Sequence, residues 1–135
     1  MTYTPLMQNK MPLPVEPAVL SCHLVNSSAA IDVPVYVPWK RCKLVYAYTV
    51  VTEAIDATGA MEIDLELNAA GGTEFASITV AGSSGVGDID EATIASYPHF
   101  DRDDASYDAV NVEIDGSAAA AGSVMLFMYF ESDRG

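Results

Sequence analysis

MEIDLELN, at residues 61–68, places an apolar side chain at every second position and an acid or amide between them. Successive side chains of a β-strand point to opposite faces, so this stretch predicts a strand with one dry and one wet face. Similar alternation returns in residues 31–37, 43–52, 107–114 and 123–130, with turn-rich segments between them. Together with strands at 18–25 and 74–80, it predicts an all-β fold, an antiparallel, jelly-roll-like β-sandwich of about seven or eight strands.

Turn-forming residues predict how these strands connect. DATG at residues 56–59 favours a hairpin between 43–52 and 61–68, and a glycine-containing loop favours a closing pair of 107–114 with 123–130. Gly71-Gly72 favours a tight connection from 61–68 to 74–80. A proline at position 34 predicts an edge strand, whereas residues 43–52 suit the middle of a sheet. Residues 88–97 are expected to form a short irregular or one-turn helical segment.

The first 17 residues carry prolines at positions 5, 12, 14 and 17. Proline at this density prevents helix formation and pairing within a central strand, so we expect an extended N-terminal arm followed by one domain, residues 18–135. The arm also contains Leu6, Met7, Met11, Leu13 and Val15, which are too many apolar residues for a purely solvated tail. Two arrangements remain open: the arm lies across its own domain, or it packs on a neighbouring molecule.

The chain has 135 residues and a formal net charge of −13. Nucleic-acid binding depends on Lys and Arg neutralising phosphates, so direct binding to DNA or RNA is not expected. No apolar stretch reaches the roughly 20 residues of a membrane helix, and the N-terminus lacks a secretory signal, so a soluble intracellular protein is expected. Lys40, Arg41 and Lys43 lie close to Trp39. These cations either offset nearby acids or form a contact patch for an acidic partner.

The chain shows no catalytic or metal-binding motif. His23 and His99 are its only histidines, too few for a multi-histidine zinc site, and its serines lack the nucleophile-elbow pattern. DRDD at residues 101–104 suggests calcium, but serine and valine stand where the helix-loop-helix calcium pattern needs glycine and glutamate. Cys22 and Cys42 are expected to be buried thiols, and a disulfide between neighbouring strands remains open. We expect a non-enzymatic protein without cofactor or tightly bound metal.

Several stretches together resemble the small head decoration, or cement, proteins of tailed bacteriophages. They are IDVPVYVP at residues 31–38, CKLVYAY at 42–48, TEAIDATGA at 52–60, and the alternating strand followed by Gly71-Gly72. The resemblance covers residues 28–80 and implies a β-sandwich, often trimeric, that binds the outside of a capsid and stabilises capsomer junctions. It implies no catalytic residues. The implied partners are the major capsid protein and further copies of the chain, and the implied location is the virion exterior, after synthesis in the host cytoplasm.

Capsid or subunit contacts are then expected from the apolar residues of the arm and from the cationic cluster with its tryptophan. Arg pairs bidentately with carboxylates, and Trp is enriched at binding hot spots. A phage head-fibre or tail component remains an alternative, as does a non-catalytic carbohydrate-binding module, which normally exposes aromatic side chains for stacking on sugars. The expected contact residues are Leu6, Met7, Met11, Leu13, Trp39, Lys40, Arg41 and Lys43.

Overall fold

The computed structural model describes residues 18–56, 58–67, 72–115 and 121–132, so the predicted arm at residues 1–17 lies outside the described part. The described residues form ten β-strands, and no helix among them could cross a membrane. In chain order the strands are β1 (Ala18–Val25), β2 (Ile31–Tyr36), β3 (Cys42–Glu53), β4 (Met61–Leu67), β5 (Glu74–Val80), β6 (Ile89–Glu91), β7 (Thr93–Ile94), β8 (His99–Phe100), β9 (Ala109–Asp115) and β10 (Ser123–Ser132).

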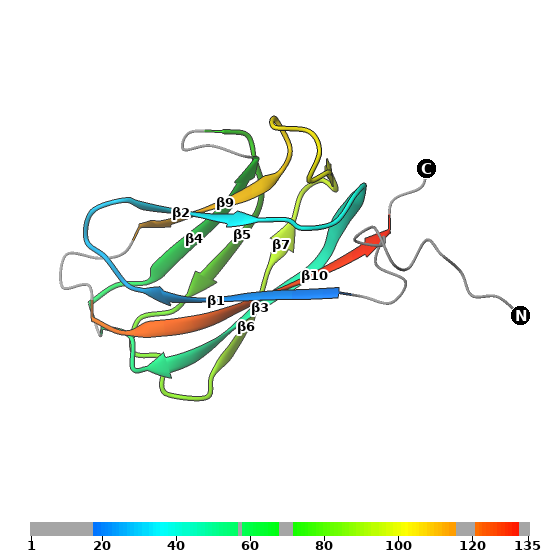
Figure 1. The fold of residues 1–135 in the computed structure, drawn as a ribbon. Helices are drawn as coiled ribbons and strands as arrows, with labels where there is room; N and C mark the ends of the chain where they lie inside the picture. The colour runs from blue at the N-terminus through cyan, green and yellow to red at the C-terminus, as the bar shows by residue number, and fades with distance from the viewer. Residues whose placement is uncertain (1–17, 57, 68–71, 116–120, 133–135) are drawn as a thin grey trace, which may run out of the picture.

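The strands form two antiparallel sheets that pack on each other as a sandwich (Figure 1). Sheet A has the order β1-β10-β3-β6, and β8 also pairs with β3. Sheet B has the order β2-β9-β4-β5-β7. The apolar positions of the alternating strands point between the sheets, as in β4, whose Met61, Ile63 and Leu65 are fully buried. The predicted all-β, sandwich-like fold is confirmed.

The chain changes sheet at almost every connection, and this overturns two predicted strand pairs. Only β4 and β5 are consecutive strands that pair within one sheet, as predicted. The hairpin between residues 43–52 and 61–68 is wrong, because β3 pairs with β10 and β6 while β4 pairs with β5 and β9. The closing pair is also wrong, because β9 lies in sheet B and β10 in sheet A. Turn residues reverse the chain, but they do not select the sheet that the next strand joins.

Two predicted strand positions are confirmed. β2, which contains Pro34, is an edge strand of sheet B, where a missing N–H is tolerated. β3 lies inside sheet A, paired along its length with β10 and over three residues with β6. The other edge of sheet A is β1, which pairs with β10 over all eight of its residues.

Short strands explain why ten strands occur where seven or eight were predicted. Residues 88–97 were expected to be irregular or helical, but β6 pairs with Tyr48, Thr49 and Val50 of β3, and β7 pairs with β5. The expectation was wrong because β3 and β5 offer hydrogen-bonding edges that two or three residues can complete. Such tertiary pairing overrides a weak local preference.

The inward faces of both sheets share one core. Phe100 is fully buried in this core, and its ring centroid lies 5.6 Å from that of Phe75 in sheet B and 6.1 Å from that of Phe130 in sheet A. Burial of each such side chain contributes roughly 1.5–3 kcal/mol to folding. Thr49 is the polar exception: its side chain is 0% exposed, and its Oγ1 has no hydrogen-bond partner within the described residues.

Cys22 and Cys42 form no disulfide, because β10 lies between their strands. Cys42 is buried as predicted, whereas Cys22 is only partly covered. Burial nevertheless raises the pKa of the Cys22 thiol to about 11. The thiolate fraction at neutral pH is therefore small.

Candidate binding surfaces

The outer face of sheet A carries a cluster of aromatic and apolar side chains. Tyr46, Tyr48, Phe127 and Tyr129 point outward from β3 and β10, and their rings contact one another. Monomeric proteins rarely expose large contiguous apolar patches, so a surface of this kind indicates a site of interaction. We call it the aromatic face, comprising Val19, Val25, Tyr46, Tyr48, Val50, Ile89, Met125, Phe127 and Tyr129.

Ring packing within the aromatic face occupies the faces of its central rings. Tyr48 stacks on Phe127 with centroids 5.1 Å apart and an interplanar angle of 21°, and it also stacks on Tyr129 at 6.1 Å. A hydrogen bond with Tyr129 raises the pKa of the Tyr48 hydroxyl, and partial desolvation adds to the shift. The central rings therefore offer edges and hydroxyl groups to a partner. Tyr46, at the border of the cluster, is 38% exposed.

The outer face of sheet B has the opposite chemistry. Its described strands bring together seven carboxylates and contain no Lys or Arg. Register places Asp32, Glu113 and Asp64 directly opposite one another on β2, β9 and β4. Like charges opposite one another in a sheet are destabilising. We call this surface the acidic face, comprising Asp32, Glu62, Asp64, Glu66, Glu74, Glu113 and Asp115.

Asn111 holds two of these carboxylates together. Its Nδ2 donates hydrogen bonds to Asp32 Oδ1 at 2.8 Å and to Glu66 Oε1 at 2.9 Å. Carboxylate oxygens of Asp32, Glu66 and Glu113 lie within 4.8 Å of one another. Such oxygens suit a hard cation, but an acidic cluster by itself does not establish a metal site. The sequence predicted Glu66 to be solvated; instead it is 7% exposed beneath its neighbours.

Desolvation, followed by electrostatic repulsion, raises the pKa of two carboxyl groups on the acidic face. Desolvation raises the pKa of Asp64, and the charges of Glu74, Glu66 and Glu62 raise it further. Desolvation also raises the pKa of Glu113, followed by the charges of Glu66 and Asp32. Both shifts mean that the folded protein disfavours the charged form of these carboxyl groups.

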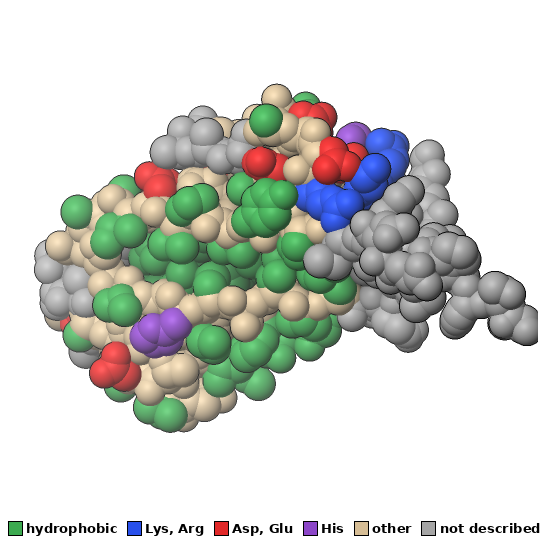
Figure 2. Space-filling model, in the orientation of Figure 1, with side chains coloured by type: hydrophobic (Ala, Val, Ile, Leu, Met, Phe, Trp, Pro, Cys, Tyr) green, Lys and Arg blue, Asp and Glu red, His purple; other side chains and the backbone are tan. Residues whose placement is uncertain are grey.

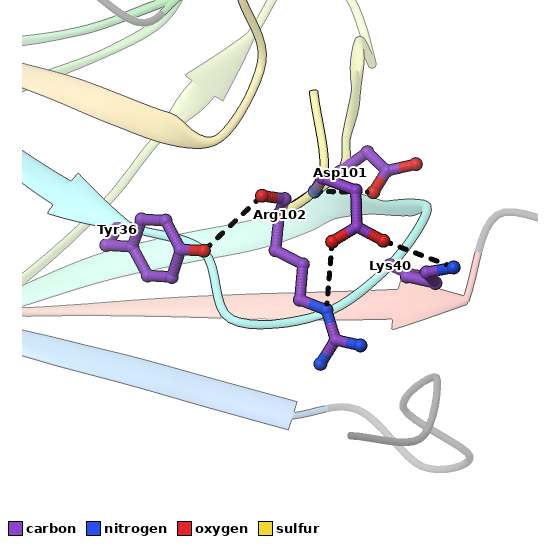
Figure 3. Close-up of polar contacts among 5 residues, drawn as sticks. Tyr36, Lys40, Asp101 and Arg102 are labelled. Atoms are coloured by element: carbon purple, nitrogen blue, oxygen red, sulfur yellow. Dashed lines mark hydrogen bonds and ion pairs between the residues drawn. The ribbon is translucent and has the colours of Figure 1, made fainter. Parts of the chain in front are cut away.

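Lys and Arg side chains gather at one end of the sandwich, next to acidic ones (Figure 2). Lys40 Nζ lies 3.1 Å from Asp103 Oδ2, and Arg102 Nε lies 3.5 Å from Asp103 Oδ1 (Figure 3). The Tyr36 hydroxyl donates to the Arg102 carbonyl at 3.4 Å, and Asp103 N donates to Asp101 Oδ1 at 2.9 Å. Lys40 therefore offsets the negative charge of a loop aspartate, as in the first of the two alternatives that the sequence left open for the cationic cluster.

The other three residues of the predicted cationic cluster lie in different surroundings. Trp39 is partly buried against the core and lies 5.7 Å from the Phe130 ring, so much of its surface is used inside the domain. Arg41 is exposed and has φ of 43°, a left-handed conformation that is uncommon for a residue other than glycine. Lys43 points outward on β3, in line with Tyr46 of the aromatic face. Neither Arg41 nor Lys43 forms an ion pair within the part of the chain that the structure describes.

The two histidines are not brought together. His23 is exposed on β1, with Nε2 3.4 Å from Thr52 Oγ1, and His99 lies on β8 with its ring 5.9 Å from that of Tyr107. The hydroxyl of Ser123, which neighbours Thr52, donates to Glu53 at 2.9 Å. The acidic loop uses its side chains locally, because Asp101 and Asp104 accept hydrogen bonds from backbone amides two residues later.

Sequence reasoning missed the aromatic face, although a signal was present. Tyr46 and Tyr48 are two residues apart, and so are Phe127 and Tyr129, so each pair shares one face of its strand. What the sequence lacked was the pairing of β3 with β10, which brings the two pairs together. The predicted contact residues Leu6, Met7, Met11 and Leu13 lie outside the described residues.

No protein-family model and no curated protein matches the chain. One solved structure that matches the chain weakly comes from Bacillus endospore appendages, which form disulfide-linked pili. It is 15% identical, the match covers 85% of this chain and 88% of that chain, and the TM-score is 0.32. A similarity at this level carries no information about function.

Proposed function

We propose that the chain is a structural virion protein that binds the outer surface of a tailed-phage capsid, with the aromatic face as its contact surface. The observation that carries the proposal is the opposite chemistry of the two outer faces. Covering apolar rings is favourable, whereas covering carboxylates that have no opposite charge beside them costs free energy. A sandwich with these two faces rests on a larger surface through sheet A and turns the acidic face of sheet B toward solvent.

Cations at the end of the aromatic face complete the proposed contact surface. Lys43 lies on the same face of β3 as Tyr46, and Arg41 is exposed just before β3. Their positive charges favour an acidic capsid exterior and fix the orientation of docking. The apolar residues of the arm add further contacts to the capsid or to neighbouring copies. In this proposal the domain is jelly-roll-like, assembles as a trimer, and has the major capsid protein as its partner.

A carbohydrate-binding role is the second candidate, because three tyrosines gather on one outer face. Sugars stack on open ring faces. Here the ring face of Tyr48 packs on Phe127 and Tyr129, which leaves mainly ring edges for a partner. This geometry favours a protein surface over a glycan. A head-fibre or tail component could use the same face, and copy number per virion distinguishes it from a decoration protein.

The test measures occupancy on purified heads of the phage that encodes the chain. Tyr46→Asp, on the exposed border of the aromatic face, is expected to weaken binding by about 30-fold, the equivalent of about 2 kcal/mol for a hot-spot aromatic. Arg41→Glu with Lys43→Glu is expected to reduce occupancy with an unchanged circular dichroism spectrum. Arg41→Gly removes the positive charge and allows the positive φ at this position without strain. A loss of binding in this variant is therefore due to the lost charge and not to backbone strain.

Tyr97→Asp is the matched control, because Tyr97 is 57% exposed and lies in the connection between β7 and β8, outside the aromatic face. It is expected to bind like the unsubstituted chain. Equal occupancy of Tyr46→Asp and Tyr97→Asp would mean that the aromatic face is not the contact surface. Absence of binding to heads together with glycan binding lost in Tyr46→Asp would replace the proposal with the carbohydrate-binding role.

A further inference from the structure

One side of the sandwich is open between the edge strands of the two sheets. β1 borders sheet A and β2 borders sheet B, and no ladder joins them. Both strands lie on the side that faces the viewer in Figure 1, and apolar side chains are visible between them in Figure 2. We call this strip the open edge, comprising Leu20, Cys22, Val33, Val35 and Trp39, which contact the core but are only partly buried.

The open edge also presents an unprotected β-strand. β1 has the sequence AVLSCHLV, with no proline, lysine or acid across eight residues. Edge strands are normally shortened, charged or interrupted by proline to prevent pairing with other chains. β2 follows that rule with Asp32 and Pro34, whereas β1 does not. One side of β1 therefore remains available as a template for an added strand.

The N-terminal arm contains a segment whose pattern fits this site. In the sequence MPLPV, residues 11–15, Met11, Leu13 and Val15 alternate with two prolines. In an extended conformation the three apolar side chains share one face. The row of Met11, Leu13 and Val15 side chains could therefore cover the half-buried Leu, Cys and Val side chains of the open edge.

The two prolines of this segment determine how it could pair. In an extended strand, the backbone N–H groups of successive residues point to opposite lateral edges. Pro12 and Pro14 thus remove donors from one edge only, and the other edge keeps the N–H groups of Met11, Leu13 and Val15. Such a segment can add to one strand but cannot template a further one.

The segment is poorly placed to cover the open edge of its own domain. Folding back along β1 in a tight hairpin would need Glu16 and Pro17 as a two-residue turn, since β1 begins at Ala18. Turns of this kind require a positive φ at the first central residue. Glu16 precedes a proline and is restricted to extended conformations. A tight hairpin of this segment on its own β1 is therefore disfavoured, which favours a second copy of the chain as the partner of the segment.

From these observations we propose that residues 11–15 of one copy add as a strand to β1 of a second copy and insert Met11, Leu13 and Val15 into its open edge. The contact is head-to-tail, so it closes into a ring or continues into a longer assembly. The proposal is independent of capsid binding, because it concerns β1 and not the aromatic face.

The first test is sedimentation velocity of the full chain over a concentration series. Leu13→Asp with Val15→Asp is expected to shift the midpoint of association by at least about a hundredfold, since two apolar side chains lose their burial. Gln8→Asp with Asn9→Asp adds the same charge to the same arm outside the inserted segment, and it is expected to associate like the unsubstituted chain. A monomeric unsubstituted chain, or equal effects of the two double variants, would overturn the proposal.

The second test asks which copy the segment occupies. A Leu13→Cys, Cys22→Ser chain is refolded together with the unsubstituted chain and treated with diamide as the oxidant. A disulfide between Cys at position 13 of one chain and Cys22 of the other is expected, giving a covalent dimer on a non-reducing gel. Thr2→Cys with Cys22→Ser is the control and is expected to give no such dimer. If Leu13→Cys with Cys22 retained gives only an internally bridged monomer, the arm covers its own domain and the proposal is wrong.

Discussion

Replacing Asn111 by leucine tests what holds the acidic face together. Asn111 is 2% exposed and donates to Asp32 and to Glu66, a carboxylate that is itself 7% exposed. Leucine keeps a similar volume and removes both donors. A hydrogen bond to a charged group contributes roughly 1.5–3 kcal/mol, and less where the acceptor is exposed, as at Asp32. We therefore expect Asn111→Leu to lower the free energy of unfolding by about 3 kcal/mol at pH 7.

Urea unfolding followed by circular dichroism measures this loss, and calorimetry gives the corresponding change in Tm. Unfolding entropies near 2.1 cal/mol/K per residue make 1 kcal/mol equivalent to roughly 3–4 °C for a chain of 135 residues, so a decrease of about 10 °C is expected. A loss below about 1 kcal/mol would refute the reasoning, because it would mean that the buried carboxylate does not depend on Asn111.

Thr49→Val is the matched comparison, since it also replaces a buried polar side chain on a strand by an apolar one of similar shape. The Thr49 hydroxyl has no hydrogen-bond partner among the described residues, so its removal relieves a desolvation cost. We expect a gain in stability of about 1 kcal/mol, opposite in sign to the effect of Asn111→Leu. A loss in both variants would show that any change in these sheets is destabilising and that hydrogen bonding does not decide the sign.

Two further substitutions test the electrostatics and the backbone. Glu113→Gln is expected to stabilise the fold by about 0.5 kcal/mol at pH 7 and by little at pH 4. The pKa of Glu113 in the folded state is raised above its usual 4.5. Between these two pKa values the folded state binds more protons than the unfolded state, so ionisation of the Glu113 carboxyl group destabilises the fold as pH rises. Urea titrations at both pH values measure the change in the free energy of unfolding. An equal gain in stability at pH 7 and pH 4 would contradict the repulsion at Glu113. Glu131→Gln is the control, and no gain is expected because Glu131 lies opposite Lys43. Gly122→Ala is expected to cost about 2–3 kcal/mol, because Gly122 has φ of 112° and an added Cβ would lie 2.7 Å from the Ala54 carbonyl oxygen. Gly85→Ala, where an added Cβ meets no atom within 4 Å, should be neutral, and similar Tm values for the two variants would contradict the argument.

The sequence predicted much of the candidate surfaces one strand at a time. Alternation placed Glu62 and Asp64 on a wet face, and it marked Lys43 as part of a β-patterned stretch. It could not show that Asp32 and Glu113, which lie 81 positions apart in the chain, stand opposite each other. Cross-strand neighbours depend on which strands pair, and that pairing is decided by burial of the whole core.

Local chemistry by itself therefore determined the all-β class, the bounds of the long strands to within a residue or two, and the edge position of the strand with Pro34. A two-residue period and the missing N–H of proline are properties of neighbouring residues, so no tertiary information is needed to read them. Only the tertiary structure decided that β3 and β4 belong to different sheets, that β6 and β7 are strands, and that four aromatic rings meet on the outer face of sheet A. Those outcomes depend on contacts between distant segments, whose free energy comes from closing two sheets over one shared core.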